Sequence, residues 1–221
     1  MLTQADVHWI ELDSVDSTND YLSRAYQQGR VSGCAVVLTQ AQTAGRGRAG
    51  RSWKAVPGAS LCFSLGLPVA GYQLPFLPLC VGLAVAEVLE RFEVPVQLKW
   101  PNDLIVGGQK LGGVLCESFH TGSGATTVIG VGLNVHPVDV PQALSGAGAS
   151  CLVQWVDASI LPSLRELAEA CVLSILHQVE AARAQGISAL FKQFALRDAW
   201  LGLEVVVLEE GKALFRANCA S

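Results

Sequence analysis

The sequence predicts an α+β protein in which a mixed, largely antiparallel β-sheet packs with helices on one of its sides. Short β-branched or alternating runs, separated by glycine-rich turns, recur from Val7 to Val135, as expected for strands joined mainly by hairpins. Longer apolar segments with helical spacing lie between and after these runs. With 221 residues, of which 51% are hydrophobic, the chain can bury a substantial core.

The N-terminal part of the chain predicts the order strand, helix, strand, loop, strand. Residues 7–15 alternate as a strand does, and Ser17 or Thr18 in "DSTN" can cap a helix that Gly29 ends. Residues 35–40 and 60–67 are short apolar runs typical of buried strands. The loop between them contains "TAGRGRAGRSW", residues 43–53.

An uncharged stretch follows, because no Asp, Glu, Lys or Arg lies between Lys54 and Glu87. Its length could suggest a membrane span, but prolines at 57, 68, 75 and 78 and glycines at 58, 66 and 71 interrupt it. A continuous apolar helix of about twenty residues is therefore excluded. We expect a buried strand, a loop and a buried helix over residues 76–92.

The second half of the chain predicts four more strands and two helices. The strands cover residues 96–100, 103–106, 110–119 and 126–135, with turns at "GGQ" and "TGSGA". After a weakly patterned Gly/Ala stretch, 139–157, a long amphipathic helix is marked by Leu164, Leu167, Cys171, Ile175 and Val179. Gly186 separates this helix from a second one over 187–196.

The final segment predicts two short strands and a turn, which are too few to bury a core of their own. We therefore assign residues 1–198 to one domain and residues 199–221 to a C-terminal β segment.

Composition excludes several classes of protein. A net charge of −4 and a pI near 5.5 argue against a protein that coats nucleic acid, and we expect no DNA binding. Seven scattered cysteines without a C-x-x-C pair indicate neither a zinc ribbon nor a disulfide framework. With no signal-peptide pattern at the start, we expect a cytoplasmic protein with no membrane segment. The sequence contains no G-x-S-x-G, and its four histidines lack ligand or triad spacing.

The loop spells G-x-G-x-x-G at Gly45, Gly47 and Gly50, as a dinucleotide-binding turn does. Such a turn must open directly into a helix, and Pro57 and Gly58 prevent this. The alternatives are a solvated surface loop and an anion-binding loop. We favour the second because four basic residues fall within nine positions of an acidic protein: Arg46, Arg48, Arg51 and Lys54.

Three further segments carry polar side chains at predicted strand ends. "KWPNDL" supplies Lys99, Asn102 and Asp103, either as a plain turn or as a site at which the Asp103 carboxylate could hold magnesium. "KLGGVLCES" places Lys110 before paired glycines, and "IGVGLNV" ends on Asn134. Paired glycines inside a strand indicate close approach of a ligand or backbone.

Trp53 and Ser17 each allow two interpretations. Trp53 could stack on a purine or cover the core, and Ser17 could cap a helix or line a pocket.

The order "DSTN", "QTAGRGRAGRSW", "KWPNDL", "KLGGVLCE", "IGVGLNV" resembles the biotin protein ligase family over about residues 10–200. The resemblance implies a biotin/lipoate ligase-like catalytic domain followed by a truncated or reduced SH3-like C-terminal segment, without a preceding DNA-binding domain. It also implies a two-step reaction: biotin and ATP give biotinyl-5′-AMP and pyrophosphate, and a carrier lysine then displaces AMP.

The resemblance assigns roles to individual residues. Lys110, Arg46 and Arg48 are expected to be catalytic, and Asp103 and Asn134 to hold Mg2+. The residues expected to bind biotin are Ser17, Thr18, Asn19, Gln42, Arg46, Arg48, Lys110, Gly113 and Gly130. Those expected to bind ATP or the adenylate are Arg48, Arg51, Trp53, Asn102, Lys110 and Asn134.

The implied partner is the biotin carboxyl carrier domain of a biotin-dependent carboxylase, and we expect a monomer or weak homodimer. Two alternatives remain open. One is a lipoate or octanoate ligase or transferase of the same fold, and the other is a non-catalytic biotin-binding remnant.

Overall fold

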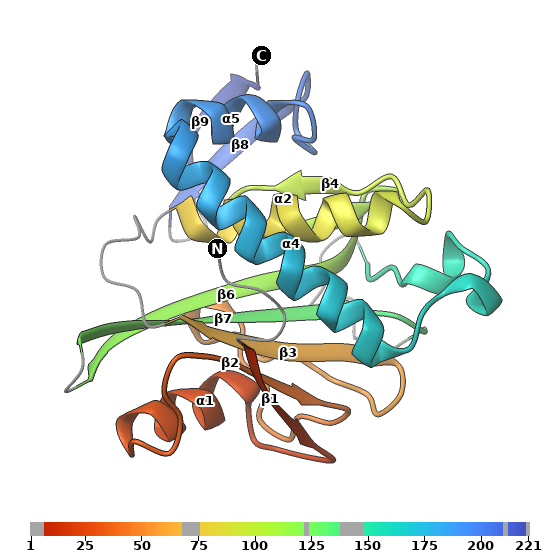
Figure 1. Ribbon diagram of the computed structural model, residues 1–221. Helices are drawn as coiled ribbons and strands as arrows, with labels where there is room; N and C mark the ends of the chain where they lie inside the picture. Colours follow the sequence, from red (N-terminus) through yellow and green to blue (C-terminus); the bar gives the residue numbers. More distant parts are fainter. Residues whose placement is uncertain (1–6, 68–75, 122–123, 138–147, 210–211, 220–221) are drawn as a thin grey trace.

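The computed structural model describes residues 7–67, 76–121, 124–137, 148–209 and 212–219. Seven strands form one sheet in the order β1-β2-β3-β7-β6-β5-β4 (Figure 1). Their bounds are β1 (Val7–Leu12), β2 (Cys34–Thr39), β3 (Ser60–Leu67), β4 (Gln97–Lys99), β5 (Asp103–Val106), β6 (Gln109–Thr121) and β7 (Gly124–Asn134). Only β1 and β2 pair in parallel, so the prediction of a mixed, largely antiparallel sheet is confirmed.

Helices cover both faces of the sheet, so the prediction of helices on one side is wrong. Helix α1 (Thr18–Gln27) packs on one face, and α2 (Leu77–Glu90) and α4 (Leu164–Gln185) lie on the other (Figure 1). In β2, Ala35 and Val37 join the core beneath α1, while Val36 and Leu38 join the larger core beneath α2 and α4. The physical reason is visible in β2 itself, where all six residues are buried. A strand without a polar face must be covered on both sides.

Local sequence signals explain where α1 begins and ends. The Ser17 side chain accepts a hydrogen bond from the Asp20 backbone N–H and caps the helix. Gly29 follows the helix with φ of 67°, the left-handed conformation that glycine adopts at no steric cost. Tyr26 lies against Gly66 of β3, where an added Cβ would be 2.3 Å from the tyrosine ring. Glycine at 66 therefore lets α1 approach the sheet closely.

The two helices of the second half form as predicted. Ser163 and Glu166 make a capping box at the start of α4, and Gly186 ends the helix with φ of 80°. Leu167, Cys171, Ile175 and Val179 are all buried, on the face that meets α2 and the sheet. Helix α5 (Ile187–Ala195) follows directly.

The hairpin between β5 and β6 turns at Gly107 and Gly108, with φ of 56° and 75°, as the "GGQ" signal predicts. The predicted "TGSGA" turn includes residues 122–123, and the Gly/Ala stretch includes residues 139–147. Both ranges lie outside the described residues. Short 3₁₀ turns at Leu152–Gln154 and Ala158–Ile160 then lead to α4.

The C-terminal strands β8 (Glu204–Glu209) and β9 (Lys212–Asn218) form a separate two-stranded sheet beside α5 (Figure 1). Backbone bonds join Leu98 of β4 to Arg197 and Ala199, just before this hairpin. The two predicted strands are thus confirmed, and the domain boundary at residue 198 stays a prediction.

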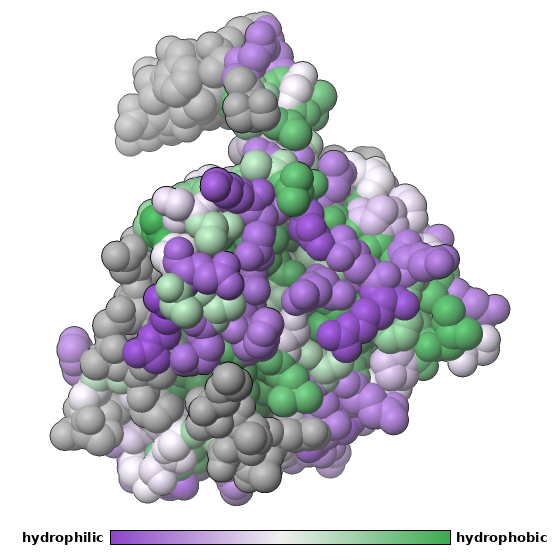
Figure 2. Space-filling view, turned by 45° about the horizontal axis from the view of Figure 1, so that its top comes forward, coloured by the Kyte–Doolittle hydropathy of each residue, from purple (hydrophilic) through white to green (hydrophobic). Residues whose placement is uncertain are grey.

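One face of the molecule carries both polar and apolar side chains. Figure 2 shows hydrophilic side chains over much of this face, with hydrophobic ones in patches between them. Within the ranges given above, no helix has both the length and the apolar character needed to cross a membrane.

Candidate active site

Every residue that the sequence nominates for the site lines one cavity of about 380 Å³. The set comprises Ser17, Thr18, Asn19, Gln42, Arg46, Arg48, Arg51, Trp53, Asn102, Asp103, Lys110, Gly113, Gly130 and Asn134. These residues come from α1 and its cap, the arginine-glycine loop (residues 43–53) and Gln42 just before it, β5, β6, β7 and the turn before β5. The structure therefore brings together segments that are far apart in the sequence.

The cavity concentrates positive charge in an acidic chain. The described lining residues include six basic side chains, Arg46, Arg48, Arg51, Lys54, Lys99 and Lys110, and one acidic side chain, Asp103. A cavity lined mainly by one sign of charge attracts ligands of the opposite sign. This arrangement suits a polyanion such as a nucleoside triphosphate.

The arginine-glycine loop is a tight hairpin and not the start of a helix. Arg46 pairs with Ser52 as an antiparallel bridge, and the Trp53 N–H donates to the Gly45 carbonyl at 2.8 Å. The tip is one 3₁₀ turn, in which Gly50 has φ of 72°. The rejection of a dinucleotide-binding turn is thereby confirmed.

Lys110 lies near the start of β6, and its Nζ is 2.7 Å from Oδ1 of Asp103 on the neighbouring strand β5. The backbone of Lys110 is held on its other side, since its N–H donates to Gly148 and its carbonyl accepts from Ser150. Gly113 lies beside this pair, and an added Cβ would be in ordinary van der Waals contact with Lys110 Nζ and Asp103 Oδ1, at 3.5 Å from each. The lysine is thus held in place at the cavity wall.

A second group of polar residues lies at the start of α1. The Thr18 N–H and hydroxyl both donate to Oε1 of Gln42, at 2.8 and 3.1 Å. Ser64 of β3, which lies in no sequence motif, donates to Thr18 Oγ1 at 2.7 Å or to Asn19 Oδ1 at 2.6 Å. These contacts set the direction of the polar groups that face the cavity.

Two glycines of β7 make room for protein side chains. A Cβ on Gly130 would lie 2.4 Å from Asn19 Oδ1, and a Cβ on Gly132 would lie 2.5 Å from the Trp53 indole. Paired glycines predict close approach of a ligand or backbone, and here side chains approach these two glycines. In this structure the groups that approach are Asn19 and Trp53, so one side of the indole lies against the sheet.

Asn102 and Asn134 line the cavity, and the side chain of each also donates a hydrogen bond to a backbone carbonyl. Asn102 accepts from Arg48 Nη1 at 3.2 Å and donates to the Val114 carbonyl at 3.1 Å. Asn134 is 4% exposed and donates to the Ser150 carbonyl at 3.0 Å. Among the residues that the structure describes, no cluster of three His, Cys, Asp or Glu could hold a metal ion.

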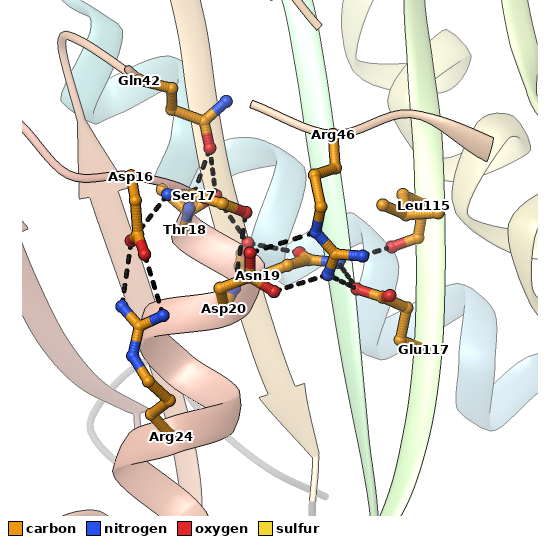
Figure 3. A network of polar contacts seen from close by, with 11 residues as sticks. Asp16, Ser17, Thr18, Asn19, Asp20, Arg24, Gln42, Arg46, Leu115 and Glu117 are labelled. Atoms are coloured by element: carbon orange, nitrogen blue, oxygen red, sulfur yellow. Dashed lines mark hydrogen bonds and ion pairs between the residues drawn. The ribbon is translucent and has the colours of Figure 1, made fainter. Parts of the chain in front are cut away.

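Two residues that the sequence motifs do not mark, Asp20 and Glu117, both bind Arg46 (Figure 3). Burial alone would lower the pKa of Arg46, but the hydrogen bond and charge of Glu117, together with Asp20, raise that pKa above its usual value. Strand periodicity could have identified Glu117. Residues 113, 115 and 117 share one face of a strand, and Gly113 already belonged to the predicted site.

The chain is similar to known proteins in sequence and in structure. The model of the "Biotin/lipoate A/B protein ligase family" matches residues 11–134. The "Bifunctional ligase/repressor BirA" of Salmonella typhimurium is 32% identical over 211 residues, which cover 92% of this chain and 63% of that protein. The "Biotin--[acetyl-CoA-carboxylase] ligase" of Mycobacterium tuberculosis is 41% identical over 138 residues, 58% of this chain and 50% of that protein.

Among solved structures, the biotin protein ligase from Aquifex aeolicus in complex with biotin and ATP has a TM-score of 0.77 and 29% identity. The match covers 92% of this chain and 84% of that one. Against the BirA proteins of Escherichia coli and Salmonella typhimurium, the chain spans 63% of their length. The family match takes in residues 11–134 of 221, including the arginine-glycine loop, Lys110 and Asn134, and the chain therefore belongs to the biotin/lipoate A/B protein ligase family.

Proposed function

We propose that this protein is an ATP-dependent biotin protein ligase. It forms biotinyl-5′-AMP and then transfers biotin to a lysine of the carrier domain of a biotin-dependent carboxylase. The observation that carries the proposal is the single cavity that joins six basic side chains to the polar group Ser17, Thr18 and Gln42. The names of the Mycobacterium tuberculosis relative and the Aquifex aeolicus structure support the choice of biotin and ATP.

In the first step, a carboxylate oxygen of biotin attacks the α-phosphorus of ATP, and the bond to the bridging oxygen breaks to release pyrophosphate. Both reactants are anions, so cations must offset their repulsion. Lys110, Arg48 and Arg51 are the cations that we assign to this task. Lys110 follows the carboxylate, and the two arginines meet the phosphates.

Biotin carries a polar ring system and an apolar chain, and we assign the ring to the start of α1. Ser17, Thr18, Asn19 and Gln42 supply the hydrogen-bonding groups of that region. Gly113 and Gly130 shape the wall on the sheet side, the second of them by admitting the Asn19 amide.

Magnesium fits this site as an ion that arrives with ATP. Mg2+ is commonly bound through one or two carboxylates together with substrate phosphates, and Asp103 places one carboxylate in the cavity wall. We assign Asp103 and Asn134 as its protein ligands, and the ion would neutralise phosphate charge.

In the second step, the carrier lysine amine attacks the acyl carbon of the adenylate. An amide bond forms, the acyl–phosphate bond breaks, AMP leaves and the amine loses a proton. The nucleophile is supplied by the partner, so the protein must position the adenylate and exclude water from it. We place this reaction in the cytoplasm, in a monomer or weak homodimer that does not bind DNA.

Exchange of labelled pyrophosphate into ATP tests the proposal, because it reports the first step alone. We expect exchange that depends on biotin and falls to background with octanoate or lipoate in its place. A background rate with all three acids would refute catalysis. Faster exchange with octanoate or lipoate would reassign the acyl substrate.

A further inference from the structure

Arg46 is held by two carboxylates from two separate elements (Figure 3). Its Nε and Nη2 contact the two carboxylate oxygens of Asp20 in α1, at 3.1 and 2.6 Å. Nη2 also lies 2.6 Å from Oε2 of Glu117 in β6. The Nε–Nη2 edge of the guanidinium is therefore already occupied by protein anions.

Glu117 is itself fixed by a second partner. Asn19 Nδ2 donates to the same Oε2 atom at 2.8 Å and lies 3.3 Å from the Leu115 carbonyl. Asn19 is 3% exposed and fills the space that Gly130 leaves. The Glu117 carboxylate thus connects the arginine-glycine loop to the buried Asn19 side chain at the start of α1.

The other loop arginines differ from Arg46. The Arg48 guanidinium contacts the neutral Asn102 side chain, and Arg51 Nε donates to the Arg48 carbonyl. Within the described part of the chain, neither has a carboxylate at ion-pair distance. Two carboxylates around one guanidinium leave a net negative charge at Arg46, which disfavours an incoming phosphate there.

The position of Arg46 in the loop adds a geometric argument. Arg46 pairs with Ser52 at the base of the hairpin, whereas Arg48 belongs to the 3₁₀ turn at its tip. The Gly47 N–H also donates to the Arg51 carbonyl at 2.7 Å. Fixing Arg46 therefore fixes the base of the loop and leaves the tip residues to meet a ligand.

We propose that Asp20 and Glu117 are positioning residues, which clamp Arg46 at the base of the arginine-glycine loop so that Arg48 and Arg51 meet the phosphates of ATP. This inference rests on the proposed function and deepens it. Arg46 then serves the reaction by placing the loop. The phosphate contacts belong to the arginines that carry no carboxylate partner.

The test compares the wild type with the double variant Asp20→Asn, Glu117→Gln, which keeps side-chain size and removes both charges. Asp16→Asn is the matched control. It weakens the neighbouring surface pair between Asp16 and Arg24, at 2.8 Å, and Asp16 does not line the cavity. All three proteins keep the trypsin sites at Arg46, Arg48 and Arg51.

Limited trypsin digestion, read by mass spectrometry, reports the clamp without relying on activity. We expect cleavage after Arg46 to be about tenfold faster in the double variant than in the wild type. Trypsin binds the side chain of the arginine after which it cuts, and in the wild type Asp20 and Glu117 hold that side chain. The control should cut at the wild-type rate. Equal cutting after Arg46 in wild type and double variant would show that no clamp exists, whatever the protein catalyses.

Pyrophosphate exchange then tests the consequence for ATP. We expect the KM for ATP to rise about tenfold in the double variant, with kcat changed less and Tm within about 2 °C of the wild type. A wild-type KM for ATP in an active double variant that is cut faster would overturn the positioning role. Absence of exchange in the wild type would refute the proposed function, and digestion would still decide whether the clamp exists.

Discussion

Lys110 is the residue on which the proposed chemistry depends most. Its ammonium contacts Asp103 at 2.7 Å, and its side chain lines the cavity and is 27% exposed. Its backbone, held between Gly148 and Ser150, fixes where the ammonium can reach. A residue placed in this way can be lost with little effect on packing and a large effect on catalysis.

We expect Lys110→Ala to abolish formation of the adenylate while the protein stays folded. The reason is that the cation which follows the carboxylate is lost, whereas the buried side chains around β6 remain. Pyrophosphate exchange and a thermal melt measure the two effects separately. Lys192→Ala, in the exposed part of α5, is the control and should behave as the wild type. An adenylation rate equal to the wild type, with only carrier transfer slowed, would remove Lys110 from the first step.

At this scale the sequence predicts the residues of the cavity better than their partners. Motifs mark Arg46, Lys110 and Asp103 because their types and spacing suit anion chemistry. Strand periodicity can place Glu117 on the same face as Gly113, but it does not show that Glu117 contacts Arg46. Asp20 and Glu117 meet only when α1 crosses beneath β6, and no spacing along the chain encodes that contact.

Among the elements, the approach of α1 to the sheet depends on one glycine. A Cβ at Gly66 would be 2.3 Å from the Tyr26 ring, which is itself anchored by its hydroxyl to the Gly33 carbonyl. Gly82 in α2 differs, because an added Cβ would be 3.3 Å from the flexible end of Leu98.

We therefore expect Gly66→Ala to lower the free energy of unfolding by about 1–3 kcal/mol, the usual cost of overpacking. Gly82→Ala is the matched control, and we expect it to change stability by less than about 1 kcal/mol, because alanine also favours the helix. Urea denaturation of both variants measures the difference. Equal stability of the two would mean that α1 does not pack against β3 in this way.

The arginine-glycine loop is the element that we expect to respond to ligand. Between Ala44 and Trp53 it has no large apolar side chain to anchor its tip, so opening of the tip costs little. Closure over the adenylate would be stabilised by charge-assisted hydrogen bonds from the tip arginines.

Trypsin should cut after Arg48 and Arg51 readily in the free protein. We expect strong protection with biotin and ATP together, and little with ATP alone, because closure follows the complete set of ligands. Sites in α4, such as Arg183, provide the internal control. Identical cutting in all three conditions would show that the loop does not close.

The order of the elements could be read from the sequence, whereas their layering could not. The ends of helices and strands depend on local backbone conformation. Helix caps at Ser17 and Ser163 and glycines at 107 and 186 therefore mark these ends in the sequence. Whether helices cover both faces of β2 depends on which strands lie inside the sheet. That is decided by long-range strand pairing, such as the pairing of β3 with both β2 and β7.

At the scale of the whole molecule, burial in the core makes cysteine thiols less reactive. Burial raises the pKa of Cys62 to about 11, even though Trp53 lowers it, and raises the pKa of Cys171 to about 12, even though Arg91 lowers it. A thiol with a raised pKa stays protonated and unreactive at lower pH.

We therefore expect Cys62 and Cys171 to resist iodoacetamide in the native protein at pH 8, and to react after unfolding in urea. Peptide mass spectrometry identifies the labelled positions. Rapid native labelling of either residue would contradict the packing of the core in which both lie.

The central claim is that one electropositive cavity joins biotin to ATP. The most direct measurement incubates the protein with biotin, ATP and magnesium, separates it from free ligand and identifies the retained small molecule by mass spectrometry. We expect biotinyl-5′-AMP in an amount close to that of the protein, and its loss when a carrier domain is added. Retained ATP and biotin without the adenylate, or an adenylate formed only from octanoate or lipoate, would contradict the account.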